Sequence, residues 1–82
     1  SPTIENPMLD YYPNPTDDFV NFIYEGELSI EVYDIYGRKI INSENKKIDL
    51  RDYNNGVYIF KIWDYALQKS KSIRIIKRWN FF

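Results

Sequence analysis

The chain has 82 residues, of which 44% are apolar and 18% aromatic, which is enough for one small core and too apolar for a disordered tail. It contains no cysteine and no histidine, so disulfides, thiolate metal ligands and the usual nucleophile–base pairs are missing, and we expect neither an enzyme nor a need for a cofactor. The net charge of −1 is divided, because residues 1–60 carry a net −6 and residues 61–82 a net +5.

Residues 1–9 contain Pro2 and Pro7 without apolar alternation, and the chain begins without Met. This composition predicts an extended linker from an upstream domain, followed by a single domain over residues 10–82.

A corner follows at Tyr12-Pro13-Asn14-Pro15-Thr16. The two prolines fix φ and lack N–H donors, so a strand cannot continue through them, and we expect the first strand to cross between two sheets here. Asn14 with the neighbouring Asp17 and Asp18 offers oxygen ligands for Ca²⁺, but the set is too small for a dedicated site, and solvated turn residues are the favoured interpretation.

The rest of the chain is typical of short strands separated by polar turns. The clearest strand alternates Leu28, Ile30 and Val32 with Ser29, Glu31 and Tyr33. Residues 57–64 are rich in β-branched and aromatic residues and predict a central strand with Tyr58, Phe60 and Ile62 on one face. Glycine and asparagine supply the turns at Gly37 and Asn55-Gly56. The expected strands after the corner are residues 19–24, 28–34, 38–42, 47–50, 57–64 and 69–78.

No segment keeps a helical period for more than one turn. Six to eight short strands at about ten-residue spacing predict an all-β fold, a small antiparallel β-sandwich. No run of about 18 apolar residues is present, so we expect no transmembrane segment. The basic residues near the end alternate with Ile73, Ile75 and Ile76, which indicates a half-buried strand and not a nucleic-acid surface.

Four segments stand in a fixed order: YPNPT at 12–16, VYDIYGRK at 32–39, NGVY at 55–58 and KSIRIIKR at 71–78. Their order and spacing resemble the C-terminal sorting domain of proteins exported by the type IX secretion system (Por secretion system) of Bacteroidetes-type bacteria. The resemblance covers about residues 9–78. It implies an immunoglobulin-like sandwich of about seven strands that acts as an address and not as a catalyst.

The resemblance also assigns roles to residues. Ten positions match the structural motifs of the family: Pro13, Asn14, Pro15, Tyr33, Asp34, Gly37, Arg38, Asn55, Gly56 and Tyr58. The last strand would be recognised by the translocon through Lys69, Lys71, Ile73, Arg74, Ile75, Ile76 and Lys77. The residues after this strand exceed the family pattern, and Trp79, Phe81 and Phe82 are candidate partner contacts. From the residues alone, the last strand is equally an edge strand with a charged outer row.

By this resemblance, the partners are the translocon, outer-membrane shuttle and sortase proteins, and an upstream cargo domain in the same chain. The cargo would cross the periplasm and reach the outer membrane, the cell surface or the extracellular space. A sortase-like peptidase would cut in or before residues 1–9.

Two other classes of function remain open. The first is a binding module, either for carbohydrate, with Tyr33, Tyr36, Trp63 and Tyr65 stacking on sugar rings, or for self-association through an edge strand. The second is an inert spacer. Carboxylate pairs for acid–base catalysis have no visible cleft in so short a chain.

Overall fold

The computed structural model describes residues 9–14 and 16–78 of the chain, and within them every regular element is a strand. The fold is therefore all-β, as the sequence predicts. The strands are β1 (Asp10–Tyr12), β2 (Phe19–Ile23), β3 (Leu28–Tyr33), β4 (Lys39–Ser43), β5 (Lys47–Asp49), β6 (Gly56–Asp64) and β7 (Lys69–Lys77). The expected strand boundaries agree with these within about a residue.

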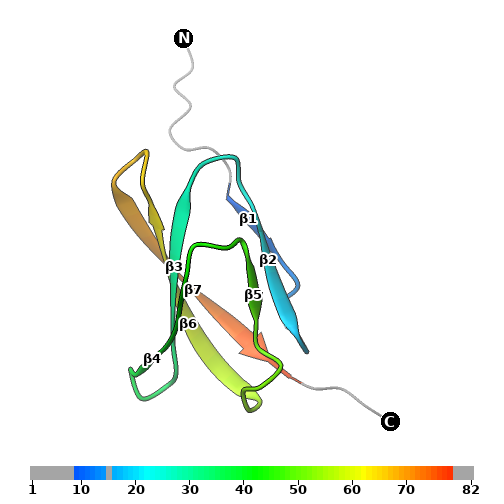
Figure 1. The fold of residues 1–82 in the computed structure, drawn as a ribbon. Helices are drawn as coiled ribbons and strands as arrows, with labels where there is room; N and C mark the ends of the chain where they lie inside the picture. The colour runs from blue at the N-terminus through cyan, green and yellow to red at the C-terminus, as the bar shows by residue number, and fades with distance from the viewer. Residues whose placement is uncertain (1–8, 15, 79–82) are drawn as a thin grey trace.

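The strands form two antiparallel sheets packed face to face (Figure 1). One sheet has the order β1-β2-β5 and the other has the order β4-β3-β6-β7. Consecutive strands β2 and β3 lie in different sheets, and β5 returns to pair with β2. This arrangement is consistent with the immunoglobulin-like sandwich that the resemblance implies.

The core lies between the sheets because alternate side chains of each strand point inward. In β3 the alternation is strict, since Leu28, Ile30 and Val32 are buried. Phe22 of one sheet meets Phe60 of the other with ring centroids 5.9 Å apart. Each such buried side chain contributes roughly 1.5–3 kcal/mol relative to exposure. The complete core is Val20, Phe22, Leu28, Ile30, Val32, Ile48, Leu50, Tyr58, Phe60, Ile62, Ile73 and Ile75.

The two ends of the sandwich differ in what they contain. The β3–β4 turn, the β5–β6 turn and the C-terminal end of β7 lie at one end, which we name the motif end (Figure 1). The β2–β3 link and the β6–β7 hairpin lie at the other. Leu9, the last residue of the expected linker, packs against the core.

Candidate functional site

The corner after β1 is bound to the outer edge of β7 through Asn14. The side-chain amide of Asn14 donates to the carbonyl of Arg74 at 3.0 Å, and its carbonyl oxygen accepts the N–H of Ile76 at 3.0 Å. One side chain thus takes the place of a neighbouring strand. Asn14 is exposed, as a solvated turn residue would be, and both polar atoms of its carboxamide are also bound to β7.

Thr16 continues this pairing along β7. Its N–H donates to the carbonyl of Ile76 at 2.9 Å, and its carbonyl accepts the N–H of Arg78 at 2.8 Å, so it forms a parallel bridge with Lys77. Because β1 pairs with β2 in one sheet and Thr16 pairs with β7 in the other, the corner crosses between sheets, as predicted. The peptide bond before Pro13 is cis. Pro15 lies outside the described residues.

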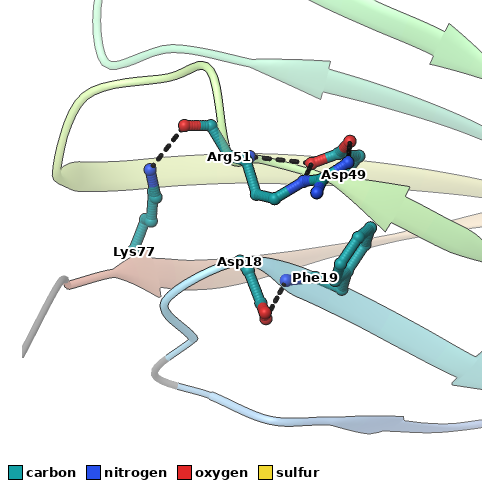
Figure 2. A network of polar contacts seen from close by, with 5 residues as sticks. All are labelled: Asp18, Phe19, Asp49, Arg51 and Lys77. Atoms are coloured by element: carbon teal, nitrogen blue, oxygen red, sulfur yellow. Dashed lines mark hydrogen bonds and ion pairs between the residues drawn. The ribbon is translucent and has the colours of Figure 1, made fainter.

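Lys77 ties the end of β7 to the β5–β6 turn. Lys77 is only 6% exposed, and its ammonium donates to the carbonyl of Arg51 at 3.4 Å (Figure 2). The ammonium also donates to the carbonyl of Tyr53. The hydroxyl of Tyr53 in turn donates to the carbonyl of Ile40 at 3.3 Å. Backbone carbonyls thus satisfy a buried cation, which would otherwise be costly.

Arg51 and Asp49 form an ion pair near Lys77 (Figure 2). The guanidinium of Arg51 lies 2.9 Å from the carboxylate of Asp49 and 4.8 Å from the ring centroid of Phe19. The ammonium of Lys47 lies 4.2 Å from the same ring. The hydrogen bonds from Arg51 hold the pKa of Asp49 below its ordinary value, and Asp49 raises the pKa of Arg51.

The VYDIYGRK segment forms the β3–β4 turn around Asp34. One carboxylate oxygen accepts the N–H groups of Tyr36 at 2.9 Å and Arg38 at 3.0 Å, and the other accepts the Arg38 side chain at 2.8 Å. Burial raises the pKa of Asp34, but these hydrogen bonds outweigh it and leave the pKa lowered. Gly37 has φ of +84°, which glycine adopts without strain. Tyr33 precedes the turn and donates its hydroxyl to Glu31 at 2.8 Å.

The NGVY segment is organised by Tyr58, whose hydroxyl donates to the carbonyl of Asn54 at 2.6 Å. Burial raises the pKa of this hydroxyl. The ring packs edge-on against Tyr53 with 6.4 Å between centroids. A groove of about 690 Å³ runs between this turn and the β3–β4 turn, and its lining includes Asp34, Tyr36, Arg38, Asn55 and Gly56. The second and third signals therefore border one groove at the motif end, and the first signal is bound to the fourth along the end of β7.

The seven expected recognition residues divide by exposure. Lys69, Lys71 and Arg74 are exposed and Ile76 is 40% exposed, whereas Ile73, Ile75 and Lys77 are buried. Odd-numbered residues of β7 point toward the core, but Lys69 and Lys71 lie in the part of the strand where both faces are exposed. The expectation of a charged outer row is wrong at the end of β7, because Ile76 faces outward and Lys77 inward.

The aromatic residues considered for sugar binding do not share one surface. Trp63 and Tyr65 line a hollow of about 270 Å³ with Ser29, Glu31 and Lys61, whereas Tyr36 lines the groove at the motif end. Trp79, Phe81 and Phe82 lie outside the described residues.

Within residues 9–14 and 16–78, no group of three acidic side chains could hold a metal ion, and no helix is long and apolar enough to cross a membrane.

Sequence reasoning did not find the roles of Thr16, Tyr53 and Arg51. Thr16 belongs to the YPNPT signal, but neither its backbone pairing with β7 nor the use of the Tyr53 carbonyl by Lys77 is visible in the sequence, because both join segments far apart in the chain. The inward position of Lys77 could have been predicted from the sequence, because residues 73, 75 and 77 alternate along one strand and their side chains therefore lie on the same face.

Comparisons with known proteins agree with this arrangement. The family model described as "Secretion system C-terminal sorting domain" matches residues 10–77. A solved structure of PorZ, described as a bacterial surface component of the type IX secretion system of Porphyromonas gingivalis, has a similar fold, with a TM-score of 0.66 and 24% identity. The match covers 87% of this chain but only 11% of that chain. A search of curated protein sequences gave no significant match.

Proposed function

Because this chain belongs to the secretion system C-terminal sorting domain family, we propose that it is a non-catalytic signal that directs an upstream cargo across the outer membrane through the type IX secretion system. Proteins with such domains are exported to the cell surface or the extracellular space. The proposal extends the family assignment to this chain's cargo, its route through the periplasm and its partners.

The observation that supports the proposal best is which residues of the four signals are bound within the fold and which stay exposed. The YPNPT signal is bound to the end of the KSIRIIKR signal, and the VYDIYGRK and NGVY signals line one groove at the motif end. This leaves Lys69, Lys71 and Arg74 of β7 as exposed cations that no described hydrogen bond or ion pair occupies. Exposed charges of one sign steer association with a complementary receptor.

In the proposed sequence of events, the domain folds in the periplasm and docks on the translocon or its outer-membrane shuttle protein through the exposed side chains of β7. The buried residues Ile73, Ile75 and Lys77 would act by holding that strand in place. A sortase-like peptidase would then cut in or before residues 1–9, and the cargo would be released or attached to the surface.

The proposal is tested by fusing a periplasm-targeted fluorescent reporter to residues 1–82. Export is compared between a strain with the type IX system and an isogenic strain that lacks the translocon pore. Reporter outside only the competent cells is the expected result. Intact, folded reporter retained in both strains would overturn the proposal, and glycan binding lost in Trp63→Ala would then support a carbohydrate module.

A second comparison tests the assigned residues. The triple variant Lys69→Glu, Lys71→Glu, Arg74→Glu should reduce export strongly, because it reverses the charge of the docking strand. The triple variant Lys69→Arg, Lys71→Arg, Arg74→Lys is the matched control, since it keeps a positive charge at each of the three positions. Equal export of both variants would remove the role assigned to these cations.

A further inference from the structure

The outer edge of β7 is divided into an occupied part and an open part. In an antiparallel ladder, alternate residues direct both N–H and C=O to the same neighbour. The carbonyl of Arg74 and both backbone groups of Ile76 point away from β6, because they bind the corner. By the same parity, Ser70 and Ser72 direct their backbone groups away from β6, since the β6–β7 register is unbroken.

The corner occupies this edge only from the carbonyl of Arg74 onward. Within residues 9–14 and 16–78, no hydrogen bond reaches the outward N–H and C=O groups of Ser70 and Ser72. Residues 69–72 are exposed on both faces of the strand. The open edge therefore covers residues 69–73 and ends where Asn14 begins.

This edge stands out among the edges of the two sheets. The other edge strands are β1 and β5, with three residues each, and β4, with five. β7 has nine residues. A long edge with free backbone groups is a template for pairing with another chain, and proteins usually cover or shorten such edges. Here the corner covers one half and leaves the other.

The charge around the open edge decides what can pair with it. Lys69 and Lys71 lie on the strand, and Lys61 is the partner of Ser72 across the β6–β7 pair. Two carboxylates lie farther from the edge, Asp64 of β6 opposite Lys69 and Glu31 of β3 opposite Lys61, so the three lysines outnumber them. An incoming strand would therefore meet an excess of positive charge.

The same charge disfavours pairing with a second copy of this chain. Antiparallel pairing of two copies at residues 69–73 would set the lysines of one copy close to those of the other. Like charges at directly opposite positions of paired strands are destabilising, whereas opposite charges stabilise the pair.

We propose that residues 69–73 of β7 receive an extended acidic segment of a partner protein, which adds as a strand to the β4-β3-β6-β7 sheet. The inference rests on the proposed function, in which that partner belongs to the secretion machinery. Backbone hydrogen bonds at Ser70 and Ser72 supply the pairing, and the lysines select an acidic sequence. Asn14 sets the limit of the added strand, because it already binds Arg74 and Ile76.

The test uses the purified 82-residue chain and two blocked seven-residue peptides, Thr-Glu-Thr-Glu-Thr-Glu-Thr and its counterpart with Lys in place of Glu. NMR titration should shift the amides of Ser70 and Ser72 with the acidic peptide and leave them unchanged with the basic one. Absence of these shifts at millimolar acidic peptide would overturn the inference.

A backbone variant separates strand pairing from charge attraction. Ser72→Pro removes an outward N–H, which an edge strand tolerates, and should weaken acidic-peptide binding by about tenfold, as expected for roughly 1.4 kcal/mol. Ser72→Ala is the matched control and should bind as the unchanged chain does. Equal binding by the proline and alanine variants would contradict strand addition.

A charge-exchange variant keeps the test valid if Ser72→Pro does not fold. Lys69→Glu with Lys71→Glu should reverse the preference, so that the basic peptide binds and the acidic one does not. An unchanged preference would overturn the inference. A dimer of the unchanged chain in sedimentation equilibrium that Ser72→Ala retains and Ser72→Pro abolishes would also overturn it, in favour of self-association.

The reporter assay distinguishes failure of this inference from failure of the proposed function. Pore-dependent export of the unchanged fusion with normal export of a folded Ser72→Pro fusion would overturn strand addition and leave the sorting function intact. Loss of export in Ser72→Pro alone is the expected result. Retention of the unchanged fusion in both strains would overturn the sorting function itself.

Discussion

The two halves of β7 belong to one continuous strand but have opposite surroundings. In the C-terminal half, the side chains of Ile73, Ile75 and Lys77 are buried, and the corner covers the outer edge. In the N-terminal half, residues 69–72 are exposed and their outer backbone groups have no partner among the described residues. Both halves are rich in basic residues, so charge alone does not separate them.

The difference shows that a basic residue in this strand can have either of two roles. Lys77 is a structural cation whose ammonium is held by backbone carbonyls, whereas Lys69 and Lys71 keep their charges in solvent. A family pattern that marks the whole strand as basic does not distinguish these roles. The burial of each side chain and the pairing of the strand edge distinguish the two roles.

The largest expected effect of a single change in β7 is on stability at Ile75, which is 0% exposed. Ile75→Ala should lower the free energy of unfolding by about 2–5 kcal/mol, because it removes buried methylene groups and leaves a cavity. Its neighbour Ile76 is 40% exposed, and Ile76→Ala should cost less than about 1 kcal/mol. Urea denaturation measures both, and equal losses would contradict the assigned orientation of the strand.

A smaller loss is expected from Lys77→Met, which keeps the apolar stem but removes the ammonium. The carbonyls of Arg51 and Tyr53 would lose their donor, which costs about 1–3 kcal/mol in a buried setting. Arg74→Met, on the exposed face, should change the free energy of unfolding by less than about 0.5 kcal/mol. A Lys77 variant as stable as the Arg74 variant would show that the lysine is not a structural cation.

Loss of the Asn14 side chain should have a modest effect on stability and a specific effect on the edge. Asn14→Ala removes two exposed hydrogen bonds to β7 and should cost about 1 kcal/mol. It should also extend the acidic-peptide shifts to the amide of Ile76. Asp17→Ala, at an exposed position in the same link, is the control and should do neither.

The smallest expected effect is the pH dependence that arises at the motif end. The Arg51 hydrogen bonds lower the pKa of Asp49 from the ordinary value of 3.8, so its contribution is complete above that value and is lost as the pH falls through the folded pKa. The urea midpoint should therefore fall as the pH drops below about 4. In Asp49→Asn the urea midpoint should fall less over the same pH range. An equal fall in the variant would show that the Asp49–Arg51 pair is not a source of the pH dependence.

The sequence alone predicts the strands and the inward faces well, because alternation in β3 and β6 is strict and the turns carry glycine and asparagine. It also predicts that residues 13–16 turn between sheets. It does not predict where that corner ends, because the pairing of Asn14 and Thr16 with β7 joins positions about 60 residues apart. Such contacts depend on how the sheets stack.

The same limit applies to the candidate site. The sequence marks seven residues of the last strand, and its alternation indicates the inward face, but only the fold shows that the edge beside Ser70 and Ser72 is open. The ammonium of Lys77 can be buried because the carbonyls of Arg51 and Tyr53 in the β5–β6 turn accept its hydrogen bonds. No local pattern around Lys77 encodes those acceptors.

Amide hydrogen exchange along β7, measured by NMR on the 82-residue chain, tests the division of this strand most directly. The account predicts strong protection at Ile76 and Arg78, whose N–H groups bind the corner, and fast exchange at Ser70 and Ser72. Protection at Ser70 and Ser72 equal to that at Ile76 would contradict it, because the outer edge would then be covered along its whole length.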